Sequence, residues 1–121
     1  LLDEAGVGPI SAAQLLISWS HPGRLRSEAC FARLAGVAPI PASSGTTHRH
    51  RLDRGGDRTL NNAIHSIALT RARTDPQTKA YIQRRISQGK TRREAIRALK
   101  RHITRRLYRL LETTSRTLDN T

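Results

Sequence analysis

Residues 34–52 read LAGVAPIPASSGTTHRHRL and form the longest stretch of the chain without a helical repeat of apolar residues. The stretch contains two prolines and a Ser-Ser-Gly turn, and it ends in the basic run His48–Arg51. The segments on both sides have helical periodicity, so we expect one long loop set into a helical domain. Loops of this length are uncommon in compact domains, and most of them are either functional or disordered. A surface loop rich in turn-forming residues is the alternative interpretation.

Positive charge dominates the composition. There are 22 Lys+Arg against 9 Asp+Glu, which gives a formal net charge of +13, and 19 of the 22 are arginine. Such an excess on a small domain indicates a polyanionic partner, bound in a way that weakens steeply with salt. The planar arginine fork also matches phosphate in a bidentate fashion. No segment pairs a wide aromatic apolar face with a lysine face, so nucleic acid is favoured over membrane.

The length of 121 residues fits a single domain spanning residues 1–121. Cys30 is the only cysteine, so neither a disulfide framework nor a cysteine zinc site is possible, and we expect this thiol to be buried and structural. No apolar run approaches a transmembrane length and no signal peptide is visible, so we expect a cytoplasmic protein. The chain does not begin with methionine, so we expect a fragment, a processed product or an excised domain.

The first residues predict two helices joined by glycines. Leu1–Ala5 is expected to be the end of one helix, and Pro9 suits the first turn of the next. Helix, Gly-Val-Gly and helix in this order resemble a helix-hairpin-helix, in which Gly6 and Gly8 let backbone N–H groups approach a DNA phosphate. A plain interhelical turn is the alternative. The second helix is expected to bury an apolar stripe of Ile10, Ala12, Ala13, Leu15, Leu16, Ile17 and Trp19.

Helix caps divide the rest of the chain. Ser27 predicts the N-cap of a helix that turns Cys30, Phe31 and Leu34 inward, and Gly36 can end this helix. After the long loop, Asp57 can cap a helix with an apolar face. That face comprises Leu60, Ala63, Ile64, Ile67 and Ala68.

Two further helices follow. Asp75-Pro76 predicts the start of the fourth helix, and the capping box from Thr91 to Glu94 predicts the start of the fifth. Polar residues 113–121 are expected to fray. The sequence therefore predicts an all-α domain of about five helices, with a helix-hairpin-helix-like beginning and one long loop.

The fifth helix carries four arginines at a spacing of four: Arg97, Arg101, Arg105 and Arg109. Like charges at this spacing destabilise a helix by about 0.2–0.5 kcal/mol per pair. We therefore interpret the first three as nucleic-acid contacts; a solvated face is the alternative.

The long loop holds the residues that suggest chemistry. Ser44 precedes Gly45, which lets the backbone approach a substrate, and a serine becomes nucleophilic when a base or strong electrostatics activates it. His48 or His50 could move protons. Nearby arginines could clamp a phosphodiester and stabilise the charge that develops on its oxygens, namely Arg49, Arg51, Arg54 and Arg58. The acidic residues are scattered, so no metal site is expected within this chain.

Four ordered blocks carry a family resemblance. Gly6–Ala13 resembles a G-(I/V)-G-P-x-x-A block, Phe31–Pro39 an A-x-x-A-G-L-x-P block, and Ser44-Gly45 an S-G pair. Arg51–Leu60 resembles a basic, glycine-containing block that usually ends in arginine, where this chain has Asn61. Together they resemble the C-terminal domain of insertion-sequence transposases that join a RuvC-like DEDD nuclease domain to a serine-containing domain. This group is related to the Piv DNA invertase and includes bridge-RNA-guided recombinases.

The resemblance implies site-specific DNA recombination. By position Ser44 would attack a DNA phosphodiester and form a covalent phosphoserine link, with Ser43 as the neighbouring candidate, while Arg51, Arg54 and Arg58 would hold phosphate. Mg²⁺ would be bound by the DEDD domain, which this chain lacks, so the chain alone should not complete strand exchange. Implied partners are DNA, a structured guide RNA and further copies of the protein, in the bacterial cytoplasm close to the nucleoid.

Two other classes of function remain open from the residues. A non-catalytic DNA- or RNA-binding module would explain the charge and leave Ser44 dispensable. A helical assembly domain would use its apolar stripes for dimer contacts and show little salt-dependent DNA affinity.

Overall fold

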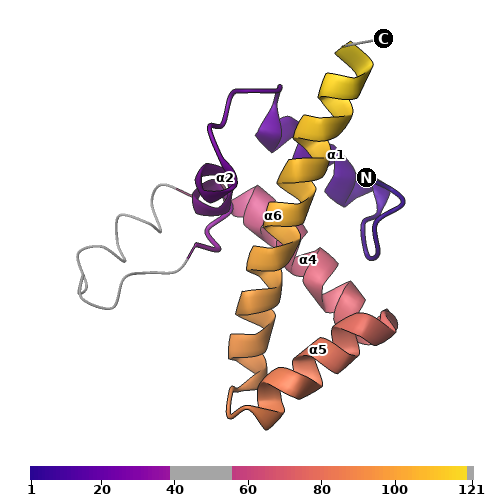
Figure 1. The fold of residues 1–121 in the computed structure, drawn as a ribbon, viewed down its shortest axis with the longest axis vertical. Coiled ribbons are helices and arrows are strands. Elements are labelled where there is room, and N and C mark those ends of the chain that lie inside the picture. The colour runs from indigo at the N-terminus through magenta and orange to yellow at the C-terminus, as the bar shows by residue number, and fades with distance from the viewer. Residues whose placement is uncertain (39–55, 120–121) are drawn as a thin grey trace, which may run out of the picture.

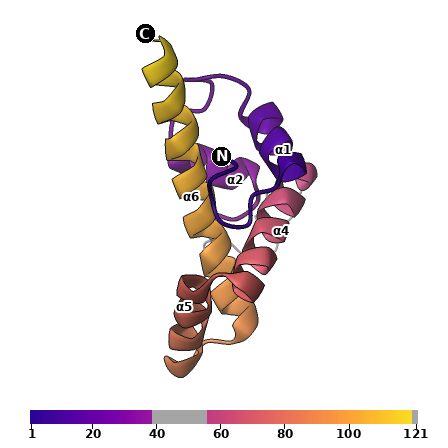
Figure 2. The same ribbon diagram turned by 90° about the vertical axis from the view of Figure 1, so that its right-hand side faces the viewer.

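The computed structural model describes residues 1–38 and 56–119, with side chains up to residue 114. This part of the chain contains helices and no strand, which confirms the all-α prediction. The five helices are α1 (Pro9–Trp19), α2 (Glu28–Leu34), α4 (Arg58–Thr74), α5 (Pro76–Ser87) and α6 (Arg92–Asp119). Figure 1 shows α6 running the length of the molecule, with α4, α5 and the N-terminal half of α6 forming a triangle. Turned by 90°, the molecule shows α1 and α2 nearer the other half of α6 (Figure 2).

The helix boundaries follow the predicted caps. Ser27 accepts a hydrogen bond from the Cys30 amide at 3.3 Å, and Asp75 accepts one from the Thr78 amide at 3.1 Å. At α6, Thr91 and Glu94 exchange two hydrogen bonds of 3.1 Å, as a capping box should.

The end of α2 is also as predicted. Gly36 has a left-handed φ of 72°, and the Val37 amide reaches back to the Ala32 carbonyl at 3.0 Å. This pairing closes a helix through a left-handed residue, a position that glycine occupies without steric cost.

The core is built from one face of each helix. The predicted stripe of α4 is buried, and Phe31 and Leu107 are fully buried where α2 meets α6. Trp19 is buried at the end of α1, as expected. The buried positions of α6 include Ile96, Leu99, Ile103, Leu107 and Leu111.

The predicted stripe of α1 is wrong in part. Ala12, Leu15 and Trp19 are buried, whereas Ile10 is 88% exposed and Ile17 is 70% exposed. Leu16 and Ala13 are exposed as well. Because α1 packs chiefly against α4, one neighbour covers one side of the helix, and the wider apolar stripe faces outward.

Leu1–Ala5 forms turns rather than the end of a helix. The Glu4 amide bonds the Leu1 carbonyl at 3.0 Å, and the Val7 amide bonds the Glu4 carbonyl at 3.2 Å. Both bonds join residues three apart, so they close turns and not a turn of α-helix.

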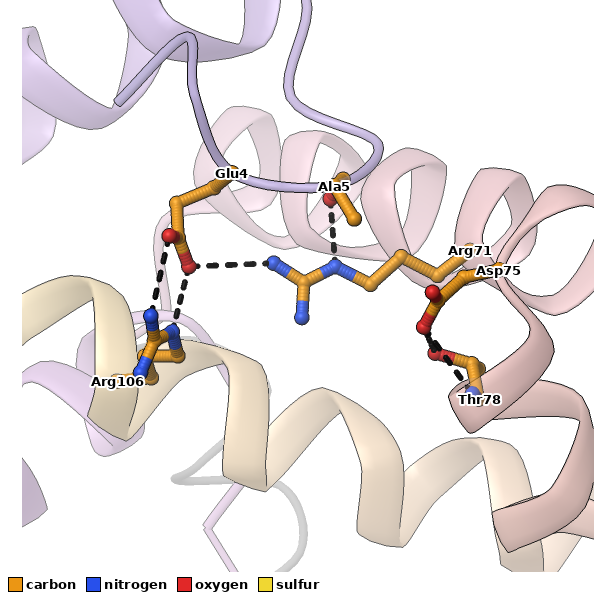
Figure 3. Close-up of polar contacts among 6 residues, drawn as sticks. All are labelled: Glu4, Ala5, Arg71, Asp75, Thr78 and Arg106. Carbon is orange, nitrogen blue, oxygen red and sulfur yellow. Dashed lines mark hydrogen bonds and ion pairs between the residues drawn. The ribbon is translucent and has the colours of Figure 1, made fainter.

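Glu4 anchors this segment through tertiary contacts. Its carboxylate accepts hydrogen bonds from Arg106 at 2.5 and 3.1 Å and lies 3.7 Å from Arg71, whose Nε donates to the Ala5 carbonyl at 2.5 Å (Figure 3). The hydrogen bond from Arg106 holds the pKa of Glu4 below its ordinary value. The N-terminal turn is thereby fastened to α4 and α6 at once.

Cys30 is half-buried, which corrects the prediction of a core cysteine. Phe31, Ala32 and Ala35 form the buried face of this segment, and Cys30 falls outside it because successive helical residues are rotated by about 100°. Its sulfur contacts the Ser27 hydroxyl at 3.5 Å and an Arg33 nitrogen at 3.4 Å. These two hydrogen bonds lower the pKa of the thiol.

α6 continues to Asp119, so it covers most of residues 113–121; the fraying of this end stays a prediction. None of the helices described here is long and apolar enough to cross a membrane.

Candidate nucleic-acid interface

Leu34 and Asp57, which flank the sequence segment with the predicted nucleophile, are held together by a backbone hydrogen bond. The Asp57 amide donates a hydrogen bond of 2.7 Å to the Leu34 carbonyl. This bond holds the start of α4 against the end of α2. The segments that lead into and out of residues 39–55 are therefore fixed side by side.

Asp57 joins α1 to the same point. One carboxylate oxygen accepts the Leu60 amide at 2.9 Å and so caps α4, as predicted. The other accepts the hydroxyl of Ser18 at 2.7 Å. Ser18 is buried and itself accepts a hydrogen bond from Gln14 at 2.8 Å. Asp57 thus connects three helices: its carboxylate bonds α1 and caps α4, and its backbone amide bonds the end of α2.

Asn61 extends the junction to α6. Its amide nitrogen donates to the Ala35 carbonyl at 2.6 Å, and its oxygen accepts from the Lys100 ammonium at 3.4 Å. A Cβ atom on Gly36 would lie 3.2 Å from the same amide nitrogen, so the glycine also gives this side chain room. The sequence marked Asn61 only as a departure from the expected arginine, and its connecting role was missed.

Of five residues that were predicted to form the site, one lies within the described residues. Ser44, Arg49, Arg51 and Arg54 lie outside the described residues. Arg58 is the first residue of α4 and is exposed, next to the Asp57 junction. The junction therefore presents one predicted phosphate-binding side chain to solvent.

The two predicted phosphate-binding glycines differ in their surroundings. Gly6 has φ of +79° and packs against α4, where an added Cβ would come within 2.9 Å of the Ile67 carbonyl oxygen. Gly8 is the N-cap of α1, is exposed, and has no heavy atom within 4 Å of an added Cβ. Gly6 therefore has a packing role, while backbone contact with DNA at either glycine stays a prediction.

The arginine row of α6 divides into two parts. Arg109 forms an ion pair with Glu28 at 2.9 Å. The side chains of Arg97, Arg101 and Arg105 form no ion pair with the described residues, and Arg97 and Arg105 are exposed. The three arginines that were predicted to contact nucleic acid are thus the ones outside the ion pair, although the charge of Arg97 also acts on the Glu94 carboxylate.

Arg97 also lines a basic cavity of 430 Å³ between α4 and the start of α6. The other lining residues are His65, Leu69, Arg92, Arg93, Ile96 and Lys100. Sequence reasoning missed this grouping because it followed one helix at a time, and the cavity forms only where α4 and α6 meet.

Metal ligands do not cluster in this part of the protein. Residues 1–38 and 56–119 contain no group of three His, Cys, Asp or Glu side chains suited to a metal ion. The carboxylates of Asp57, Asp75 and Glu94 are engaged as helix caps, and Glu4 is engaged by two arginines.

Residues 1–83 match the Transposase IS116/IS110/IS902 family, and the chain belongs to this family. It is 35% identical over 107 residues to the "Insertion element IS110 uncharacterized 43.6 kDa protein" of Streptomyces coelicolor, a match that covers 88% of this chain and 26% of that protein. It is 34% identical over 115 residues to the "Insertion element IS900 uncharacterized 42 kDa protein" of Mycobacterium paratuberculosis, covering 92% and 28%. The chain thus spans about a quarter of the length of these relatives. No solved structure matches the chain.

Proposed function

We propose that this chain is the DNA-binding, serine-bearing domain of a transposase, and that Ser44 is the nucleophile of DNA strand cleavage. Membership of the transposase family is the observation that carries the proposal. The ordered sequence blocks around Ser44 add support, and so does the junction at Asp57, where a hydrogen bond holds the residues before and after the Ser44 segment together.

In the proposed step, the Ser44 oxygen attacks the phosphorus of a DNA phosphodiester. A serine–phosphate bond forms as the bond from phosphorus to one deoxyribose oxygen breaks. The serine proton leaves to a base, for which His48 or His50 is available, and the departing DNA oxygen takes up a proton. Negative charge on the phosphoryl oxygens would be stabilised by arginine forks, supplied by Arg49, Arg51, Arg54 and Arg58.

Mg²⁺ chemistry is assigned to a separate DEDD domain of the full-length protein. The carboxylates of the described residues do not fit a metal centre, because they form no cluster and several are used in caps or ion pairs. No step within this chain is therefore routed through a metal. DNA, a guide RNA, self-association and a place near the nucleoid are proposals for the whole protein.

An excision assay tests the proposed function. A plasmid that carries the element with its ends would be supplied with the full-length protein, and excised and rejoined DNA would be quantified. We expect Ser44→Ala to abolish excision while Ser43→Ala retains it. Full excision by the Ser44→Ala protein would refute the assignment, whereas loss with Ser43→Ala alone would move the nucleophile by one residue.

The alternative is a non-catalytic nucleic-acid-binding module. The basic cavity between α4 and α6 favours it as a second candidate, because that cavity needs no nucleophile to bind a polyanion. Under this alternative the Ser44→Ala protein would keep both its nucleic-acid affinity and its excision activity.

A further inference from the structure

We propose that the cavity between α4 and the first turns of α6 is a binding groove for a nucleic-acid backbone, in which Arg93, Arg97 and Lys100 contact successive phosphates. The proposal rests on the function given above and adds to it a second surface, distinct from residues 39–55. Part of that surface belongs to α6, which lies beyond the residues matched by the family.

The charged side chains that line the groove are positive. Of its seven lining residues, Arg92, Arg93, Arg97 and Lys100 are cationic, and no described carboxylate lines it. The nearest acidic side chain along α6 is Glu94, and its carboxylate is turned to the Thr91 amide at 3.1 Å. Glu94 also interacts electrostatically with Arg97, but it does not line the groove, so an anion that entered would meet four cations and no carboxylate in the lining.

The positive charge of Lys100 is only weakly compensated by the protein. It is half-buried, and its ammonium contacts only the Asn61 oxygen among the described residues, at the long distance of 3.4 Å. Burial, and then the nearby charge of Arg97, lower the pKa of Lys100. A phosphate beside this ammonium would supply the counter-charge that the protein does not.

The length of the groove indicates a polymer rather than a single phosphate group. Arg93 and Lys100 are seven residues apart on α6, which corresponds to about 10 Å along the helix axis. Arg97 lies between them on the same side, while His65 and Leu69 of α4 form the opposite wall and Ile96 is buried beneath. A row of cations over this distance suits several phosphates in series, held by backbone contacts that do not read sequence.

Asn61 connects this groove to the junction at Asp57. The same side chain that accepts a hydrogen bond from Lys100 donates one to Ala35 at the end of α2. The groove therefore starts beside the junction at Asp57 and extends along α4 and the first turns of α6. A strand presented to that junction could continue into the groove.

The test compares two double variants that remove the same charge. Arg93→Gln/Arg97→Gln removes two exposed arginines of the groove, and Arg26→Gln/Lys79→Gln removes two exposed cations that do not line it. Affinity would be measured by fluorescence anisotropy across a salt series, on labelled duplex DNA and on a labelled RNA hairpin. Circular dichroism would verify that both variants keep the helical content of the wild type.

Each phosphate contact on duplex DNA contributes about 0.9 to the slope of log affinity against log salt, or roughly 3.5-fold between about 50 and 200 mM. We expect the groove variant to lose about two such contacts. The factor by which salt weakens its binding over that range should therefore be about 12 times smaller than the factor for the wild type. Loss with DNA, with RNA or with both supports the groove and identifies the strand it holds. Equal affinities and slopes for the two double variants, on both probes, would overturn the proposal.

The proposal of a binding groove and the proposal that Ser44 is the nucleophile can be refuted separately. Ser44→Ala should bind both probes with the affinity and salt dependence of the wild type. If Ser44→Ala proved fully active in excision while the groove variant lost its binding, the catalytic proposal would fall and the groove would stand.

Discussion

Replacing Asp57 with alanine should destabilise the protein more than the loss of an ordinary helix cap. The change removes the cap on the Leu60 amide, a loss that costs about 1 kcal/mol in typical helices. It also leaves the buried Ser18 hydroxyl with only its contact to Gln14, and a buried polar group deprived of a partner costs about 1–3 kcal/mol. We therefore expect the free energy of unfolding to fall by about 2–4 kcal/mol.

Urea denaturation followed by far-UV circular dichroism gives this free energy. Asp57→Asn is the matched control, because asparagine is an equally good N-cap and should recover most of the loss. Ser18→Ala completes a double-mutant cycle, and the two changes together should cost less than the sum of the single changes, since they share one hydrogen bond. A cost below about 0.5 kcal/mol for Asp57→Ala, or strict additivity with Ser18→Ala, would refute the view that this carboxylate joins α1 to α4.

Three further predictions follow from individual contacts. The pKa of Glu4 is held below its ordinary value of 4.5, so its contribution to stability is present above pH 4.5 and is lost as the pH falls through the lowered value. The difference in unfolding free energy between wild type and Glu4→Gln should therefore shrink in acid. A difference that stays constant with pH would contradict this reasoning. Gly6→Ala should lower the free energy of unfolding by about 1–2 kcal/mol or more because of its positive φ, and Gly8→Ala, which meets no atom within 4 Å, should cost clearly less in the same urea titration. Arg105→Gln should reduce the salt slope of DNA binding by about 0.9, whereas Arg109→Gln should change it little because Glu28 already neutralises that side chain; equal effects would show that the ion pair does not hold in solution.

The helix boundaries could be predicted because they depend on local chemistry. Ser27, Asp57, Asp75 and Thr91 each bond an amide within three residues of themselves, so a reader of the sequence needs no knowledge of the fold to find them. The interior face of α4 was predictable for the same reason, since one regular stripe of apolar residues fixes the direction in which the helix must face.

The predictions that are wrong concern residues whose burial or conformation depends on contacts with other helices. Periodicity on α1 showed which residues are apolar but not that α4 would cover only one side, so the exposure of Ile10 and Ile17 could not be foreseen. Leu1–Ala5 was read as helix because its tertiary anchor, Arg106, lies 102 positions from Glu4 in the chain. The connecting role of Asn61 was hidden in the same way, since its partners come from α2 and α6.

The candidate site was predictable only where its residues share a local pattern. The spacing on one helix identifies Arg97, Arg101 and Arg105, and these side chains form no ion pair with the described residues. Arg93 and Lys100 were not grouped with His65, because the groove they share depends on how α4 crosses α6. Ser44 was selected from its place within ordered sequence blocks, and it lies outside the described residues, so its role stays a prediction.

Trapping of a covalent protein–DNA adduct would test the central claim most directly. The full-length protein would be incubated with Mg²⁺ and labelled donor DNA and then denatured, and the bound peptide would be identified by mass spectrometry after digestion. We predict a nucleotide linked through phosphate to Ser44, present in the wild type and in Ser43→Ala and absent from Ser44→Ala. Cleaved DNA without any adduct, or an adduct that persists in Ser44→Ala, would contradict it.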